Sequence, residues 1–158
     1  MDRLTEHEIE ALREALDDEY HAWATYDQVI ADFGEVAPFV NIREAEARHI
    51  EALLFLYRAF GLQVPENDWP GRVERYPSLQ VACEAGVAAE VANAGLYDRL
   101  LAEPVRPEIA AVLQRLRQAS QERHLPAFRR CAGRQRVEGG TEGDCVSGRP
   151  RRWRGGRS

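Results

Sequence analysis

The chain has 158 residues, of which 44% are hydrophobic and 30% charged, so it fits one globular domain with a sizeable core and leaves no room for a second catalytic domain. Its net charge of −5 is unevenly distributed. Residues 132–158 hold seven arginines against three acids, a net +4, and residues 1–131 therefore carry −9. An acidic folded part argues against nucleic acid as its main partner.

A first helix is predicted from a cap at Thr5 to Gly34. Thr5 and Glu8 have the spacing of a capping box, and glycine commonly ends a helix. Apolar side chains recur every three or four residues, as on the inner face of a helix, and one member of the stripe is a carboxylate. The stripe consists of Ile9, Leu12, Leu16, Glu19, Trp23, Tyr26, Ile30 and Phe33.

A second helix is expected to follow the short loop at 36–38 and to end at Gly61. Because the loop is short, the two helices should lie antiparallel. Two polar residues again interrupt an apolar stripe, which reads Phe39, Ile42, Glu46, His49, Leu53, Leu56 and Phe60.

Residues 61–78 hold three prolines and two glycines without an apolar period, which predicts a long connector. Trp69 is expected to pin this connector onto the helices. Ser78 suits the N-cap of a third helix, from Leu79 to about Ala102.

The last helix is predicted to begin after Pro104 and Pro107 and to run to about Cys131. Residues 132–158 are poor in apolar side chains, so we expect a folded domain over 1–131 and a disordered tail over 132–158. The inner face of this helix carries Ile109, Leu113, Leu116, Ser120, His124 and Phe128.

Four helices of roughly 20 residues would each be about 30 Å long. A connector of about 17 residues can run the length of such helices. The sequence therefore predicts an all-α four-helix bundle with one long crossover between the second and third helices, which is the ferritin-like topology.

The two halves of the chain repeat one pattern. Aligning Glu19 with Glu90 sets EYHAWATYD against EVANAGLYD, and EARH at 46–49 corresponds to QERH at 121–124. The glutamate-to-histidine separation is 30 residues in the first half and 34 in the second. A pseudo-twofold relation between the halves would bring five residues to one level, namely Glu19, Glu46, His49, Glu90 and His124.

Ionised groups between apolar neighbours need a partner, and a metal ion is the natural partner of converging carboxylates and imidazoles. Carboxylate and imidazole without thiolate suit iron or manganese, and zinc often substitutes. Any one of these residues could instead pair with an arginine, for example Arg43, Arg48 or Arg123. Such pairing of Glu19 and Glu90 would favour a structural role.

With these residues the chain resembles the ferritin-like di-iron proteins, whose motif is a Glu from each of two helices and a Glu-x-x-His from each of the other two. It is similar to a little-characterised prokaryotic ferritin-like family of unknown function, over roughly residues 4–131, in segments such as DEYHAWATYDQVIADFGEVAPFVNIREAEARHIEALL and ASQERHLPAF. The resemblance implies that the five residues above bind metal and that Tyr26 and Tyr97 contact these ligands without binding metal themselves.

The fourth helix departs from this motif. It offers Gln121 where the motif has Glu, and Glu122 lies about 200° around a regular helix from His124. Pro126 has no N–H to donate to Glu122, so a local bulge could swing Glu122 inward. We therefore keep both Gln121 and Glu122 as candidate ligands.

The ligand count motivates the hypothesis that a centre of two iron ions oxidises Fe(II) with O2 or H2O2, which would be a ferroxidase or peroxide-reducing reaction. Rubrerythrin-type peroxidases resemble the bundle but add a rubredoxin domain with two CxxC pairs, so an external electron donor would be needed here. The alternative is a non-catalytic bundle that acts as a scaffold or stress-response module. Oxygenation of a substrate would require an apolar pocket beside the metals. We expect a homodimer by default.

The remaining residues lead to further expectations. Cys83, Cys131 and Cys145 are odd in number and form no CxxC pair, which predicts neither a disulfide framework nor a thiolate site.

No secretory signal or membrane-length apolar segment is evident, so a cytoplasmic location without a membrane partner is expected. Tyr26 and Tyr97 are expected to pack in the core with a hydrogen bond to a glutamate. Four polar residues, His7, His21, Asp27 and Asp98, are expected at the surface or between helices.

Overall fold

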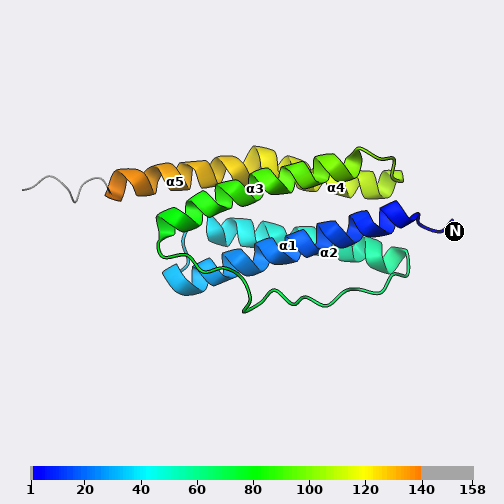
Figure 1. Cartoon of the computed structure of the whole chain (residues 1–158), viewed down its shortest axis with the longest axis horizontal. Helices are drawn as coiled ribbons and strands as arrows, with labels where there is room; N and C mark the ends of the chain where they lie inside the picture. Colours follow the sequence, from blue (N-terminus) through cyan, green and yellow to red (C-terminus); the bar gives the residue numbers. More distant parts are fainter. Residues whose placement is uncertain (1, 140–158) are drawn as a thin grey trace, which may run out of the picture.

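The structure, a computed structural model, describes residues 2–139, and these contain helices and no strands. The helices are α1 (Glu6–Phe33), α2 (Phe39–Ala59), α3 (Leu79–Leu101), α4 (Pro107–Ala119) and α5 (Leu125–Gly139), and a π-helical turn, η1 (Ser120–His124), joins the last two (Figure 1). The all-α bundle predicted from the apolar periodicity is confirmed. None of these helices has both the length and the apolar content that a membrane crossing requires.

The helix ends follow the local signals in the sequence. The Thr5 hydroxyl accepts from the Glu8 N–H at 3.1 Å, and the Glu8 carboxylate accepts from the Thr5 N–H at 2.8 Å, so the predicted capping box is present. Ser78 caps α3 by accepting from the Val81 N–H at 3.2 Å. Gly61 ends α2 with φ of 64°, a left-handed conformation that costs glycine little.

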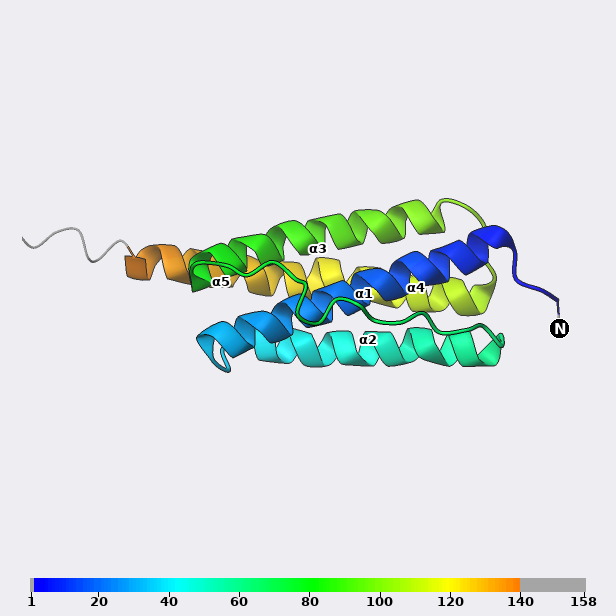
Figure 2. The same cartoon turned by 60° about the horizontal axis from the view of Figure 1, so that its bottom comes forward.

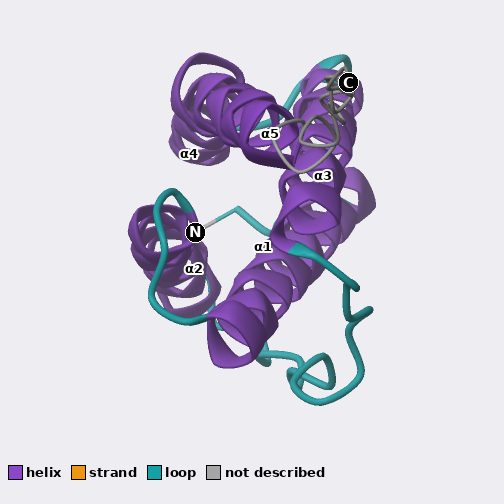
Figure 3. Cartoon of the chain, turned by 90° about the vertical axis from the view of Figure 1, so that its left-hand side faces the viewer, coloured by secondary structure: helices purple, strands orange, loops and turns teal. Residues whose placement is uncertain are grey.

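The bundle consists of two antiparallel hairpins. One is α1 with α2, and the other is α3 with the long rod formed by α4, η1 and α5 (Figures 1 and 2). The segment between α2 and α3 runs back along the outside of the bundle, so α3 points in the same direction as α2 (Figure 2). Viewed end-on, α2 and α4 lie on one side of the bundle and α1 and α3 on the other (Figure 3).

Trp69 holds the crossover segment against α1, as expected. Its indole N–H donates to Asp17 at 2.9 Å, and its ring lies 4.2 Å from that of His21 between centroids. The crossover segment is thereby fixed near its middle.

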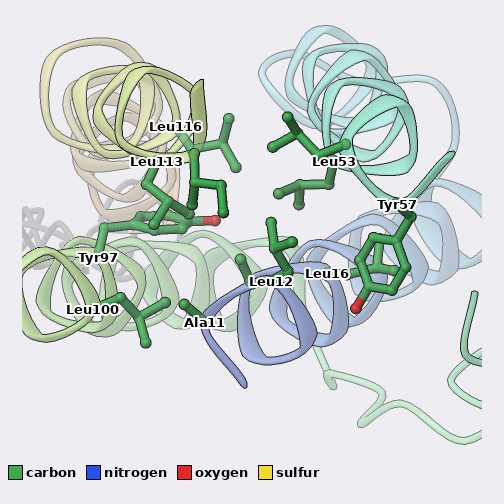
Figure 4. Close-up of a cluster of buried hydrophobic side chains, with 12 residues drawn as sticks. Ala11, Leu12, Leu16, Leu53, Tyr57, Tyr97, Leu100, Leu113 and Leu116 are labelled. Atoms are coloured by element: carbon green, nitrogen blue, oxygen red, sulfur yellow. The ribbon is translucent and has the colours of Figure 1, made fainter. Parts of the chain in front are cut away.

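The apolar core is divided into two clusters. One lies towards the N-terminal end of α1 and contains Leu12, Leu16 and Leu53 together with Tyr97 and Leu113 (Figure 4). The other surrounds Tyr26, Phe39 and Phe128. The buried carboxylates and imidazoles described below lie on the same helices, between these two clusters in the sequence of each helix.

A disulfide joins Cys83 of α3 to Cys131 of α5, with the two Cα atoms 5.7 Å apart. The prediction that the cysteines form no disulfide was therefore wrong. The two residues are 48 positions apart in sequence, and only the packing of α3 against α5 brings their fully buried side chains together. Cys145 lies outside the described residues.

The folded part also extends beyond the predicted boundary at residue 131. Helix α5 continues to Gly139, and Ala132 is buried in the core. Arginine and glutamine favour helix, so this segment can continue the rod without a large apolar face. The rest of the predicted tail, residues 140–158, lies outside the described residues.

Candidate metal centre

Five side chains predicted as metal ligands converge in the middle of the bundle. Their ligand atoms form two groups, each with all atoms within 4.8 Å of one another, and Glu46 belongs to both. Glu19, Glu46 and Glu90 are each 1% exposed, and His124 is 3% exposed. The two groups are Glu19, Glu46 and His49, and Glu46, Glu90 and His124.

Glu46 is the shared member because its two oxygens face different histidines. Its Oε2 lies 2.8 Å from Nδ1 of His49, and its Oε1 lies 3.2 Å from Nδ1 of His124. Each histidine also faces one outer carboxylate at 3.5 Å, His49 that of Glu19 and His124 that of Glu90. The expected pseudo-twofold arrangement is therefore present around Glu46.

Two buried tyrosines donate hydrogen bonds to Glu19 and Glu90, the two outer glutamates of the centre. The Tyr26 hydroxyl of α1 donates to Oε1 of Glu90 on α3 at 2.7 Å, and the Tyr97 hydroxyl of α3 donates to Oε1 of Glu19 on α1. Each tyrosine thus occupies one carboxylate oxygen and leaves the other, Oε2, directed to the centre. These contacts match the packing role expected for both tyrosines.

Several buried ligand atoms have no hydrogen-bond partner. They are Oε2 of Glu19, Oε1 of Glu46, Oε2 of Glu90 and Nδ1 of His124. Among residues 2–139, no arginine lies within ion-pair distance of these glutamates. A buried polar atom without a partner costs about 1–3 kcal/mol. A cation bound between these atoms would satisfy all four, so the donor set fits a metal.

The centre holds protons when no metal is bound. Burial and the adjacent charge of Glu46 raise the pKa of Glu19 well above its usual value. Burial opposes the ionised form of Glu46, but its close contacts with Glu19, His124 and His49 outweigh this effect and lower the pKa of Glu46. For His124, burial lowers the pKa, whereas Glu46 and Glu90 raise it, with a net value of about 9. A metal must therefore displace protons from Glu19 and His124 at neutral pH.

The fourth helix does not supply a carboxylate. Both Gln121 and Glu122 are exposed, and Glu122 accepts a hydrogen bond from Gln118 at 3.1 Å. The bulge considered before Pro126 is present as η1, in which the Leu125 N–H bonds to the Ser120 carbonyl. The wider turn places Ser120 and His124 in the interior and turns the residues between them outward. Neither Gln121 nor Glu122 is part of the centre, which corrects both candidate assignments.

The other polar residues singled out from the sequence lie away from the centre. His21 is exposed against Trp69, and His7 lies 3.4 Å from Glu103. Two carboxylates join neighbouring helices, each at 2.7 Å from an arginine. These pairs are Asp27 with Arg43 and Asp98 with Arg117.

Sequence reasoning missed two polar residues beside the centre, Asp18 and Asn93. Each has a buried side-chain oxygen without a partner, and burial together with the charges of Glu90 and Glu46 raises the pKa of Asp18 to about 7. They line a cavity of about 170 Å³ between α1 and α3, whose other walls are mostly apolar. The position of Asn93, one helical turn after Glu90, was the signal available in the sequence.

A second hollow lies between α2 and the η1–α5 segment. It has a volume of about 470 Å³, and both His49 and His124 line it. This groove thus reaches the candidate centre through both histidines, whereas none of the five converging residues lines the mostly apolar cavity between α1 and α3.

No protein-family model matches the chain, and no curated protein matches it. Among solved structures, a hypothetical protein from Methanococcus jannaschii is similar in fold, with a TM-score of 0.75 over 85% of each chain and a sequence identity of 21%. At this identity the likeness shows the all-α bundle fold alone.

Proposed function

We propose that this chain is a ferritin-like metal protein that binds two divalent metal ions between its four helical rods, iron in the first place and manganese or zinc as substitutes. The observation that carries the proposal is the set of buried ligand atoms without a hydrogen-bond partner on Glu19, Glu46, Glu90 and His124, and no arginine among residues 2–139 lies within ion-pair distance of these glutamates.

In this proposal the five converging residues form two metal positions that share Glu46. Glu19 and His49 would hold one ion and Glu90 and His124 the other, and Glu46, whose two oxygens face different histidines, would take part in both positions. Tyr26 and Tyr97 fix the orientation of the outer carboxylates, as is usual for groups that hold metal ligands.

Two Fe(II) ions bound here would supply electrons for the reduction of O2 or H2O2. The chain supports that chemistry in three ways. Glu19 and His124 would release their protons as metal enters, the two tyrosines keep the carboxylates aligned, and the two apolar clusters limit access of water from the two ends of the bundle.

The proposal is tested by the metal content of Glu46→Gln and of its matched control Glu44→Gln. Glu44 is exposed on the same helix, two residues away. Wild-type protein and Glu44→Gln should take up about two metal ions per chain and oxidise Fe(II) in air faster than buffer, whereas Glu46→Gln should lose both properties because it serves both positions. Equal metal content in all three proteins would contradict the proposal.

The alternative is a non-catalytic bundle, a scaffold or stress-response module. The lack of a fourth carboxylate on η1 supports it, because three carboxylates balance less of the charge of two divalent ions. Metal uptake that depends on Glu46 but gives no faster oxidation of Fe(II) by O2 or H2O2 would decide for this alternative.

A third function, oxygenation of a small apolar substrate, gains support from the cavity between α1 and α3. Tyr26 lies in its wall and also contacts Glu90. Filling this cavity by Ala89→Leu should abolish such an activity while leaving metal content unchanged, and unchanged oxygenation in this variant would exclude the cavity as the substrate site.

A further inference from the structure

The groove on the histidine side of the centre is strongly basic. Two histidines lie in its wall, and the charged residues that line it are all arginines, with no aspartate or glutamate among them. The arginines are Arg48, Arg123, Arg130 and Arg134. This is unusual on a chain whose first 131 residues carry a net charge of −9.

None of these four arginines has an ion-pair partner among the described residues. Other arginines of the bundle are used to join helices, as Arg43 is with Asp27 and Arg117 with Asp98. The groove arginines are exposed and available to a ligand.

The groove is built in the same way from both halves of the chain. Arg48 directly precedes His49, and Arg123 directly precedes His124. Each half therefore places one guanidinium at the mouth of the groove and one imidazole in its wall, and the imidazole reaches the carboxylate of Glu46. A ligand held by both arginines would lie beside both histidines.

The charges select the class of ligand. Guanidinium groups bind carboxylate and phosphate with paired hydrogen bonds, whereas a metal cation would be repelled at this mouth. A volume of about 470 Å³ accommodates a small molecule. The centre itself has only three carboxylates to balance two divalent ions, so it would gain from one more negative group.

We propose that this groove binds a small oxyanion, with a carboxylate or phosphate group held between Arg48 and Arg123 on the histidine side of the centre. The position beside bound metal rests on the proposed function, but the binding of the anion by the arginines does not. The oxyanion supplies the negative charge of a fourth carboxylate, which the second hairpin lacks.

The first experiment is calorimetric titration of the metal-free full-length chain with inorganic phosphate and, separately, with succinate. The double variant Arg48→Gln, Arg123→Gln is compared with Arg115→Gln, Arg129→Gln, which removes two exposed arginines outside the groove and changes the net charge equally. We expect saturable binding that weakens about tenfold or more in the groove variant and less than about twofold in the control. The tighter of the two anions identifies the head group.

Two results would overturn the proposal. One is the lack of saturable binding of either anion up to about 10 mM, an affinity too weak for a specific site. The other is equal weakening by both double variants, which would mean that only the overall charge matters. Circular dichroism of both variants establishes that the bundle is folded.

A second titration, with Mn(II)-loaded protein, separates this proposal from the proposed function. We expect the anion to bind more tightly when metal is present, and the metal-free Glu46→Gln variant to keep the arginine-dependent binding. Metal uptake without any tightening would overturn the placement beside the centre. Failure of metal uptake with retained arginine-dependent binding would contradict the proposed function and leave the anion site standing.

Discussion

The two hairpins of the bundle share their framework but not their ligands. In each, a glutamate accepts a hydrogen bond from a tyrosine of the other hairpin, and an aspartate pairs with an arginine of the neighbouring helix at 2.7 Å. The first hairpin adds a carboxylate and an imidazole from the regular helix α2, whereas the second adds only an imidazole, from the π-helical turn η1.

This difference shows that the two hairpins can keep the same tyrosine–glutamate and aspartate–arginine contacts while they direct different residues to the centre. A Glu-x-x-His pair presents both side chains inward only while the helix is regular, because residues three apart then share a face. In η1 the wider turn leaves His124 inside and turns position 121 to solvent. The second hairpin retains its tyrosine and outer glutamate contacts nevertheless.

The largest effect is expected from two variants that each remove one of the two proposed metal positions. Glu19→Gln should lose the proposed metal ion of the first ligand group and Glu90→Gln that of the second, because each glutamate belongs to one group only. Each variant should retain about one metal ion per chain, as measured by elemental analysis after gel filtration. Loss of both ions in either variant would show that the two positions do not fill independently.

Among the described residues, the second hairpin carries a disulfide and the first does not. Removal of this disulfide should have the next largest effect. Cys83→Ala, Cys131→Ala opens a loop of 48 residues and should lower the free energy of unfolding by about 3–4 kcal/mol. Urea unfolding measures the loss, and amide exchange should rise more in α3 and α5 than in α1 and α2. Equal exchange in both hairpins would show that the bundle opens only as a unit.

In the second hairpin, α3 and α5 also approach each other closely at Gly86. A Cβ atom on Gly86 would lie 2.5 Å from the ring of Phe128, so Gly86→Ala should destabilise the protein by about 1–3 kcal/mol. Gly95 on the same helix has free space around it, and Gly95→Ala should stabilise by about 0.5–1 kcal/mol. Thermal unfolding of the two variants gives the comparison, and shifts of the same sign would refute it.

The smallest expected effect is the pH dependence of the metal-free protein. Because the pKa of His124 is raised to about 9 from its ordinary 6.5, the stability it contributes is fully present below pH 6.5 and is lost as the pH rises through 9. The raised pKa of Glu19 acts in the same direction. The melting temperature should fall by a few degrees over this range, and His124→Gln should flatten the fall whereas the exposed His21→Gln should not. A rise with pH in metal-free protein would contradict the assigned protonation.

Much of the framework could be predicted from the sequence because its determinants are local. The caps at Thr5 and Ser78 and the three-to-four spacing of apolar residues act within one or two turns, and the buried polar residues stand out on those stripes. Five of the seven predicted ligands converge for this reason.

The features that sequence reasoning missed depend on tertiary packing. The pairing of Cys83 with Cys131 requires two helices to meet, and the extension of α5 beyond residue 131 continues a rod already packed on α3. Gln121 and Glu122 were placed with the period of a regular helix, which the wider turn of η1 does not follow.

The π-helical turn has a further consequence for any comparison of sequences. A wide turn is equivalent to the insertion of one residue into a regular helix, so positions before and after it are out of step by one. Aligning EARH with QERH letter by letter pairs Glu46 with Gln121, but the buried neighbour of His124 in the same turn is Ser120. A search for metal ligands in related chains should therefore allow a one-residue gap before this histidine, because an ungapped alignment would examine a residue that faces solvent.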